Sequence, residues 1–158
     1  MNPMLLFGYG NPGRGDDGLG PALIEAASPH APASLICLSD MQLQVEHVSD
    51  LADMQLVLFA DADMSCAAPV MLEEIYPVQD VSYTSHAMTP QALLHAFQQL
   101  YGINAPPAFL LRMRGYQFEL GDAFSAQAQH NLKAALHLVQ QLVESPDAEY
   151  WRRILQHA

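Results

Sequence analysis

Two carboxylates and one histidine stand at positions of this chain from which they could share a metal ion. Asp17 and Asp61 each follow an apolar run, and His86 precedes the start of a predicted helix. Two carboxylates and an imidazole suit a borderline divalent ion such as nickel or zinc and leave coordination positions open. Because ligands of an open parallel sheet bind beyond the carboxyl ends of its strands, we expect these three side chains to meet at that edge.

A glycine-rich loop with two adjacent acids joins the first apolar run to the first predicted helix. Gly8, Gly10 and Gly13 have the G-x-G-x-x-G spacing of dinucleotide-binding loops. Asp16 and Asp17, however, stand where the phosphates of such a ligand would lie. Carboxylates compete with phosphate for the positive end of a helix, so this loop suits a cation better than an anion.

The composition indicates one acidic domain. The chain has 158 residues, of which 51% are hydrophobic, and this is enough to bury one continuous core. Six Lys and Arg against 17 Asp and Glu give a net charge of −11, which disfavours nucleic acid and anionic membranes as partners. No segment approaches the ~18 apolar residues of a membrane span. Cys37 and Cys66 form neither a CxxC pair nor a disulfide framework, so we expect a cytoplasmic protein.

Apolar runs alternate with segments of helical period, which is typical of βα units that assemble a parallel sheet. The predicted strands cover residues 4–9, 34–38, 55–60, 70–76 and 108–114. The predicted helices cover residues 19–27, 45–54, 90–100 and 125–143. No helix separates the third and fourth strands, so the fourth is expected to be antiparallel or to lie at an edge.

The predicted fold is therefore α/β: a single domain over residues 1–146 with a mostly parallel, five-stranded twisted sheet and helices on both faces. Residues 147–158 are predicted to be a loosely attached tail that could form a short helix.

Local signals define the ends of the last two predicted helices. Thr89 can cap the third helix, Pro90 suits its first position and Gly102 follows its last turn. Ser125 can cap the fourth helix, which Pro146 would end.

These motifs together resemble the NiFe-hydrogenase maturation endopeptidases, and the resemblance extends over most of the chain. Residues that fit the N-terminal signature of that family are Gly8, Gly10, Asn11, Asp16, Gly18 and Gly20. An Asp-Ala pair after an apolar strand and a Ser-His pair before a capped helix complete the pattern. The segment 114–122 resembles members that serve soluble, multisubunit hydrogenases.

The resemblance implies a fold, an activity and a partner. Members of the family are single-domain α/β hydrolases that remove a short C-terminal extension from the hydrogenase large-subunit precursor once nickel has been inserted. The metal-contacting and catalytic residues of the family correspond to Asp17, Asp61 and His86. The implied partner is the large-subunit precursor, which supplies the nickel, and tight binding of nickel to the free enzyme is not expected.

The sequence departs from the pattern of the family in two places. The first acid is often Glu in the family, whereas this chain has the shorter Asp17. A glycine-rich segment often follows the second acid, but here residues 63–69 contain no glycine. Asp63 therefore remains an alternative to Asp61 as the second acid.

Three other functions fit parts of the same pattern. A phosphoacceptor receiver domain needs a lysine after its fifth strand, but the only lysine of this chain is Lys133, inside the last predicted helix. A dinucleotide-binding module would use Asp40 as its ribose-binding acid. A non-catalytic nickel-binding maturation chaperone would use the same three ligands and would lack only the cleavage step. Cys66 has no evident neighbouring base, so a thiol nucleophile is not favoured.

Overall fold

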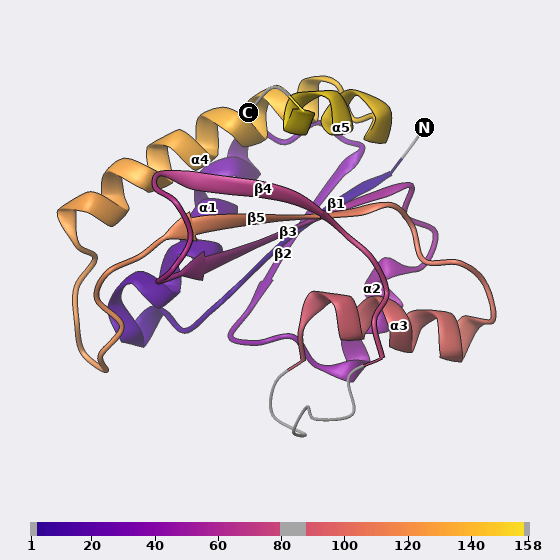
Figure 1. Cartoon of the computed structure of the whole chain (residues 1–158), viewed down its shortest axis with the longest axis horizontal. Helices are drawn as coiled ribbons and strands as arrows, with labels where there is room; N and C mark the ends of the chain where they lie inside the picture. Colours follow the sequence, from indigo (N-terminus) through magenta and orange to yellow (C-terminus); the bar gives the residue numbers. More distant parts are fainter. Residues whose placement is uncertain (1–2, 80–87, 157–158) are drawn as a thin grey trace.

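The computed structural model describes residues 3–79 and 88–156, and these residues build a five-stranded sheet between two layers of helices (Figure 1). The strands are β1 (Met4–Tyr9), β2 (Leu35–Asp40), β3 (Leu56–Asp63), β4 (Val70–Ile75) and β5 (Ala108–Arg114), in the spatial order β2-β1-β3-β5-β4. β1, β2, β3 and β5 are parallel, and β4 pairs with β5 antiparallel. The predicted mostly parallel sheet is confirmed, and β4 is both antiparallel and at the edge.

Helices cover both faces of the sheet, as predicted. The helices are α1 (Leu19–Ala27), α2 (Val48–Leu51), α3 (Pro90–Tyr101), α4 (Ala126–Glu144) and α5 (Ala148–Gln156), with 3-10 turns η1 (Pro12–Gly18), η2 (Ser28–His30) and η3 (Val45–His47). α1, α4 and α5 lie on one face, and α2 and α3 lie on the other (Figure 1).

Alternation along the strands divides the apolar residues between two cores. Leu6 and Leu58 are fully buried against α1, α4 and α5. Phe7 and Phe59, one position further along, are buried on the face of α2 and α3. Successive side chains of a strand point to opposite faces, so a strand covered on both sides must be apolar throughout. Each buried side chain of this size contributes about 1.5–3 kcal/mol.

A close approach of two backbones fixes α1 against the sheet. A Cβ atom on Gly8 would overlap the carbonyl group of Gly20, and a Cβ atom on Gly20 would overlap the backbone of Tyr9. The first turn of α1 therefore lies directly on the end of β1. This contact sets the position of the loop that carries the two adjacent acids.

Two element ends differ from the prediction by three residues. The predicted helix 45–54 consists of η3 and the short α2, and it ends at Leu51 because Ala52 has extended backbone angles and Asp53 has a positive φ of 64°. β3 continues three residues beyond its predicted end, because its last residues pair with β5 as far as Asp63↔Arg114. Asp61 thus lies within the strand and not in the following loop.

The predicted ends of α3 and the predicted cap of α4 are confirmed. The Thr89 side chain accepts a hydrogen bond from Ala92 N at 3.0 Å, and Gly102 ends α3 with a left-handed φ of 68°. The Ser125 hydroxyl accepts a hydrogen bond from Ala128 N at 3.1 Å at the start of α4.

Residues 147–156 are more firmly attached than the sequence predicts. They form α5, in which Trp151 is 0% exposed and packs edge-on against Phe109 with 5.0 Å between ring centroids. The indole N–H donates to Leu142 O at 3.1 Å and to Ser145 O at 2.9 Å. The short helix that the sequence allowed is thus present, and this one aromatic side chain attaches it to the core beside α4.

We expect Trp151→Ala to lower the free energy of unfolding by about 3–5 kcal/mol, because it leaves a cavity and removes the indole hydrogen bonds. Urea denaturation followed by circular dichroism measures this loss. Arg153→Ala, at an exposed position of the same helix, is the matched control and should change stability by less than about 0.5 kcal/mol. If Trp151→Ala changed stability as little as Arg153→Ala, α5 would not be part of the core.

Candidate functional site

Asp16 is a buried carboxylate at the centre of the loop region next to the carboxyl ends of the strands. It is 0% exposed, and its two oxygens accept four hydrogen bonds. The donors are Tyr116 N at 2.7 Å, Gln117 N at 3.0 Å, Ser125 N at 2.8 Å and Ser125 Oγ at 2.8 Å. Asp16 therefore connects the loop after β1 to the segment between β5 and α4.

These donors determine the ionisation of Asp16. Burial by itself would raise the pKa of a carboxyl group, but the hydrogen bonds from Ser125, Tyr116 and Gln117 outweigh burial and lower the pKa of Asp16 below its ordinary value. The residue is thus a stable buried anion with its acceptor sites filled. It holds the loop in place and is not available to a substrate.

Asp17, the neighbour of Asp16 in sequence, is half-buried and holds the glycine loop from the other side. Its Oδ2 accepts a hydrogen bond from Asn11 N at 2.7 Å. Gly10 has a φ of 146°, and a Cβ atom at this position would overlap the carbonyl oxygen of Asp17. Only a glycine therefore allows the loop to close onto Asp17.

Several backbone donors of this loop already have partners within the protein. Gly13 N donates to Asn11 Oδ1 at 2.8 Å, and Asp16 N donates to Gln117 O at 2.7 Å. Together with the Asn11 N–H bonded to Asp17, these contacts engage three N–H groups that a pyrophosphate cradle would use. Asp40, the ribose-binding acid of the dinucleotide-binding alternative, is engaged within the protein. Its carboxylate lies 3.0 Å from His47 Nε2 and accepts a hydrogen bond from Met41 N.

Asp61 lies on β3, and among the acids that the structure describes it is the one whose environment opposes its charge most strongly. Burial raises the pKa of Asp61 to about 7, and the nearby negative charges of Asp17 and Asp63 add to the shift. Hydrogen bonds from Ala62 N and from the Tyr9 hydroxyl act in the opposite direction. The structure thus brings Asp17 and Asp61 close enough for their charges to interact.

The structure also separates the roles of Asp61 and Asp63. The Asp63 Oδ1 atom accepts hydrogen bonds from Ser65 N at 2.7 Å and from Ser65 Oγ at 2.8 Å, and its Oδ2 lies 3.7 Å from Arg112 Nε. The hydrogen bonds from Ser65 lower the pKa of Asp63. The Asp63 carboxylate is therefore engaged by Ser65 and Arg112. The Asp61 carboxylate instead lies near Tyr9 and is influenced by the charge of Asp17.

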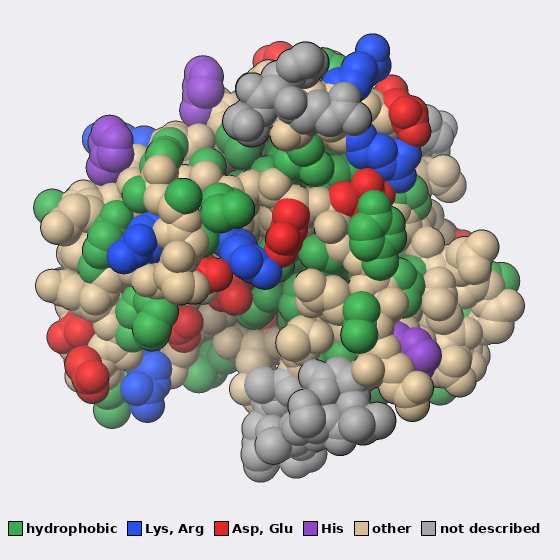
Figure 2. All heavy atoms as spheres, in the orientation of Figure 1, with side chains coloured by type: hydrophobic (Ala, Val, Ile, Leu, Met, Phe, Trp, Pro, Cys, Tyr) green, Lys and Arg blue, Asp and Glu red, His purple; other side chains and the backbone are tan. Residues whose placement is uncertain are grey.

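A recess of about 380 Å³ opens beside Asp61. Tyr9 and Asp61 line it from the sheet together with Leu110 and Arg112, and Pro90 lines it from the first turn of α3. Arg112 is held in place by Glu73, whose Oε1 lies 2.7 Å from the guanidinium Nη2. Figure 2 shows acidic and basic side chains next to one another across the middle of this view of the molecule.

His86, the third predicted site residue, lies outside the described residues. Within residues 3–79 and 88–156, no three His, Cys, Asp or Glu side chains are arranged to hold a metal ion. Of the three predicted ligands, the structure thus describes two, Asp17 and Asp61, and their service as metal ligands stays a prediction.

Sequence reasoning missed Tyr9 and the structural function of Asp16. Tyr9 could have been found from strand pairing, because Phe7 pairs with Phe59 and the same offset places Tyr9 beside Asp61. Burial raises the pKa of Tyr9 well above its ordinary value, and the charge of Asp61 adds to the shift. Cys66 is 6% exposed, and burial raises the pKa of its thiol, which does not favour a nucleophilic thiolate.

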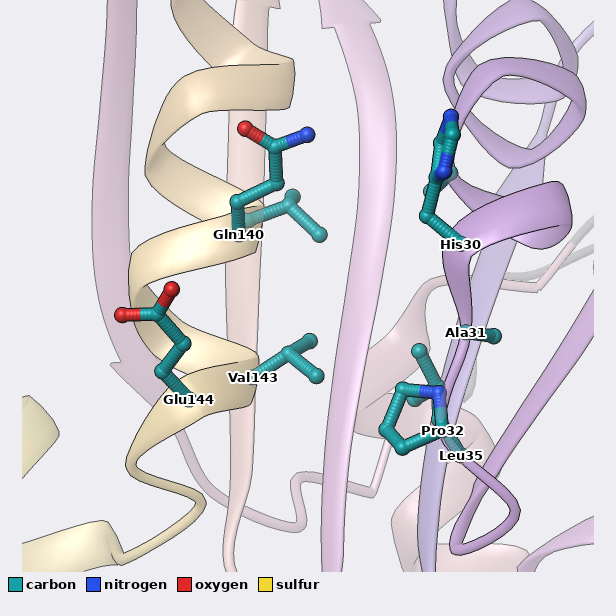
Figure 3. Close-up of a pocket in the computed structure, with 9 residues that line it drawn as sticks. His30, Ala31, Pro32, Leu35, Gln140, Val143 and Glu144 are labelled. Carbon is teal, nitrogen blue, oxygen red and sulfur yellow. The ribbon is translucent and has the colours of Figure 1, made fainter.

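A second groove, of about 520 Å³, lies at the opposite edge of the sheet (Figure 3). It runs between the segment after α1 and the last turns of α4. Leu35 and Val143 form its apolar part, and His30, Gln140 and Glu144 supply its polar atoms. None of the predicted site residues lies there.

The sequence matches no protein-family profile and no curated protein. Its fold, however, matches solved structures of proteases. The hydrogenase maturating endopeptidase HybD from Escherichia coli gives a TM-score of 0.71 at 20% identity, with 90% of this chain and 93% of that chain covered. The NiFe hydrogenase maturation protease HycI from Thermococcus kodakarensis gives 0.70 at 16% identity, covering 91% and 94%.

A hydrogenase 2 maturation peptidase from a Thaumarchaeota archaeon gives a TM-score of 0.66 at 19% identity, covering 90% of this chain and 98% of that chain. The chain thus has the α/β fold of hydrogenase maturation proteases over nearly its full described length. In the part of the chain that the structure describes, no helix has the length and apolar character needed to cross a membrane.

We expect Asp16→Ala to lower the free energy of unfolding by about 3 kcal/mol at pH 7, because it leaves four donors without their acceptor. The folded pKa of Asp16 lies below the unfolded one, so this contribution is present above the unfolded pKa and is lost as the pH falls through the folded pKa. Chemical denaturation from pH 3 to pH 8 tests both statements. Asp17→Asn is the control and should lower the free energy of unfolding by no more than about 1 kcal/mol. Equal losses for the two variants would contradict the structural role of Asp16.

Asp61→Asn should have the opposite effect on stability. The pKa of Asp61 is about 7 in the folded protein against an ordinary value of 3.8, so near pH 6 the folded state retains a proton that the unfolded chain has released. Stability therefore falls as the pH rises from about 4 to about 7. We expect Asp61→Asn to be more stable than wild type by on the order of 3 kcal/mol at pH 8 and equally stable near pH 4. A gain in stability that is the same at every pH would show that the ionisation of Asp61 is not its cause.

Proposed function

We propose that the protein is an endopeptidase that removes the C-terminal extension of a NiFe-hydrogenase large-subunit precursor after nickel insertion, with the bound nickel as its recognition signal. The observation that carries the proposal is the proximity of Asp17 and Asp61, at one edge of a fold shared with hydrogenase maturation proteases. The motifs around Gly8, Gly10 and His86 point to the same activity.

The electrostatics of the two acids favour a cation that arrives with the substrate. With a pKa of about 7, Asp61 is close to half-protonated in the free protein at neutral pH. Binding of a divalent ion would release that proton and relieve the repulsion between Asp17 and Asp61. An incomplete set of two carboxylates and one imidazole would hold a free ion weakly but would complement nickel already bound by the precursor.

In the proposed reaction, Asp17, Asp61 and His86 contact the nickel of the precursor and so place the scissile peptide bond beside the recess. One water molecule is consumed, the C–N bond breaks, and a new carboxylate and a new amine are formed. The contact with nickel would assist either by polarising the peptide carbonyl or by activating the water. Both routes use the same three side chains.

A non-catalytic nickel-binding maturation chaperone is the second candidate, because it would use the same ligands without hydrolysis. A receiver domain is disfavoured by the antiparallel β4 and by the position of Lys133 within α4. Only an assay of peptide-bond cleavage distinguishes the peptidase from the chaperone.

The test is to incubate the protein with a large-subunit precursor prepared with and without nickel and to measure the precursor's mass. We expect loss of a short C-terminal peptide only from the nickel-loaded sample. Asp17→Asn and His86→Ala should each lower the cleavage rate by about 100-fold or more while the protein remains folded. Circular dichroism reports on the fold of each variant.

Asp63→Asn is the matched control, because it removes a second carboxylate from the same strand as Asp61. It should retain cleavage, whereas Asp61→Asn should not. The reverse result would move the second acid to Asp63. Normal processing by the Asp17 and His86 variants would remove both residues from the mechanism, and intact precursor in every sample would favour the chaperone.

A further inference from the structure

The segment between β5 and α4 is held tightly against the turn η1. Gly121 N donates to Gly13 O at 2.8 Å, and Asp16 N donates to Gln117 O at 2.7 Å. A Cβ atom on Gly15 would lie 2.6 Å from Gln117 O, so the two backbones are in direct contact. The surface that the two segments share is therefore formed before any partner binds, which lowers the entropic cost of binding.

Leu120 lies on this preformed surface with its side chain in solvent. Of the large apolar side chains that the structure describes, it is the most exposed, at 72%. Pro12 and Gly13 of η1 are exposed as well. We call Pro12, Gly13 and Leu120 the turn patch. Burial of a leucine would stabilise the fold, so a well-anchored segment that presents one to water gains nothing from it in the isolated protein.

The turn patch is joined to Asp17 through Asn11. Asn11 N donates to Asp17 Oδ2 at 2.7 Å, and Asn11 Oδ1 accepts a hydrogen bond from Gly13 N at 2.8 Å. A Cβ atom on Gly13 would lie 3.2 Å from Asn11 Oδ1 and 3.9 Å from Leu120 Cδ1. A short chain of contacts thus connects Leu120 to an acid that is predicted to meet nickel.

This neighbourhood indicates which partner covers the turn patch. Under the proposed function, the nickel is bound within the precursor, so the protein surface around that nickel must lie against the loops around Asp17. A second copy of this chain would instead bring a net charge of −11 toward the same acid, and repulsion disfavours that contact. The nickel-loaded precursor is therefore the partner that suits both the acid and the apolar surface beside it.

We propose that the turn patch is a docking surface for the nickel-loaded large-subunit precursor and that Leu120 is its apolar anchor. This inference rests on the proposed function. The anchor packs against an apolar area of the precursor beside its nickel and takes no part in breaking the peptide bond. It contributes equally to the binding of the ground state and of the transition state.

The kinetic test is Leu120→Ser, which removes the apolar side chain from the turn patch. With nickel-loaded precursor, we expect KM to rise about tenfold while kcat changes by less than about twofold, as for any loss of uniform binding. Leu120→Met keeps an apolar side chain of similar volume and should keep KM within about twofold of the wild-type value. An unchanged KM in Leu120→Ser, or a fall in kcat without a rise in KM, would overturn the proposal.

Leu100→Ser is the matched control. Leu100 is 66% exposed and lies in the last turn of α3, at the opposite end of the molecule from the segment between β5 and α4 (Figure 1). This substitution should leave KM and kcat unchanged, and an equal rise in KM for both serine variants would contradict a specific docking surface. The midpoint of urea unfolding of Leu120→Ser should equal that of the wild type, because the side chain lies in solvent. A lower midpoint would assign Leu120 to the fold instead.

Binding measurements separate the docking role from the proposed function. In biolayer interferometry, nickel-loaded precursor should bind Leu120→Ser about tenfold more weakly than it binds the wild type. If the wild type binds the precursor but leaves it uncut, the peptidase fails and this comparison still decides the docking role. If the wild type neither binds nor cuts, both proposals fail.

Sedimentation of the protein without precursor tests the other occupant of the turn patch, a second copy of the chain. The wild type and Leu120→Ser should have the same mass in solution. A smaller mass for the variant would show that the turn patch joins two copies, and this would overturn the proposal.

Discussion

The arrangement of the candidate site depends on the buried carboxylate of Asp16. Its four hydrogen bonds join the loop after β1 to the segment that leads from β5 into α4. Ser125 contributes twice, since its hydroxyl donates to Asp16 and accepts from Ala128 N at the start of α4. The loop that carries Asp17 is therefore fixed to the helix layer as well as to the sheet.

Two acids in the same region show how local donors decide the behaviour of a carboxyl group. Asp16 is buried more completely than Asp61, yet its pKa is lowered because backbone and hydroxyl donors surround it. Asp61 has fewer donors and lies near two other acids, so its pKa rises to about 7. The first arrangement stabilises the fold, and the second leaves an acid whose charge is best satisfied by a partner.

The sequence predicts the sheet well because continuous apolar runs are required of strands covered on both faces. It fails at the ends of β3 and α2, where pairing with β5 and the positive φ of Asp53 decide the boundary. It predicts Asp17 and Asp61 at one edge but does not reveal that Asp16 is a buried structural anion. That role depends on donors about 100 positions away in sequence, which no local pattern contains.

The contact between Asp16 and Ser125 spans 109 residues, and this separation has a consequence for the order of folding. Contacts between distant parts of a chain close large loops and form slowly compared with local turns. α1 follows Asp16 directly and packs on α4 across a similar separation, so this contact closes together with the helix layer. The loop that carries Asp17 therefore gains its final form only after the segment that ends at Ser125 has been made and has joined it.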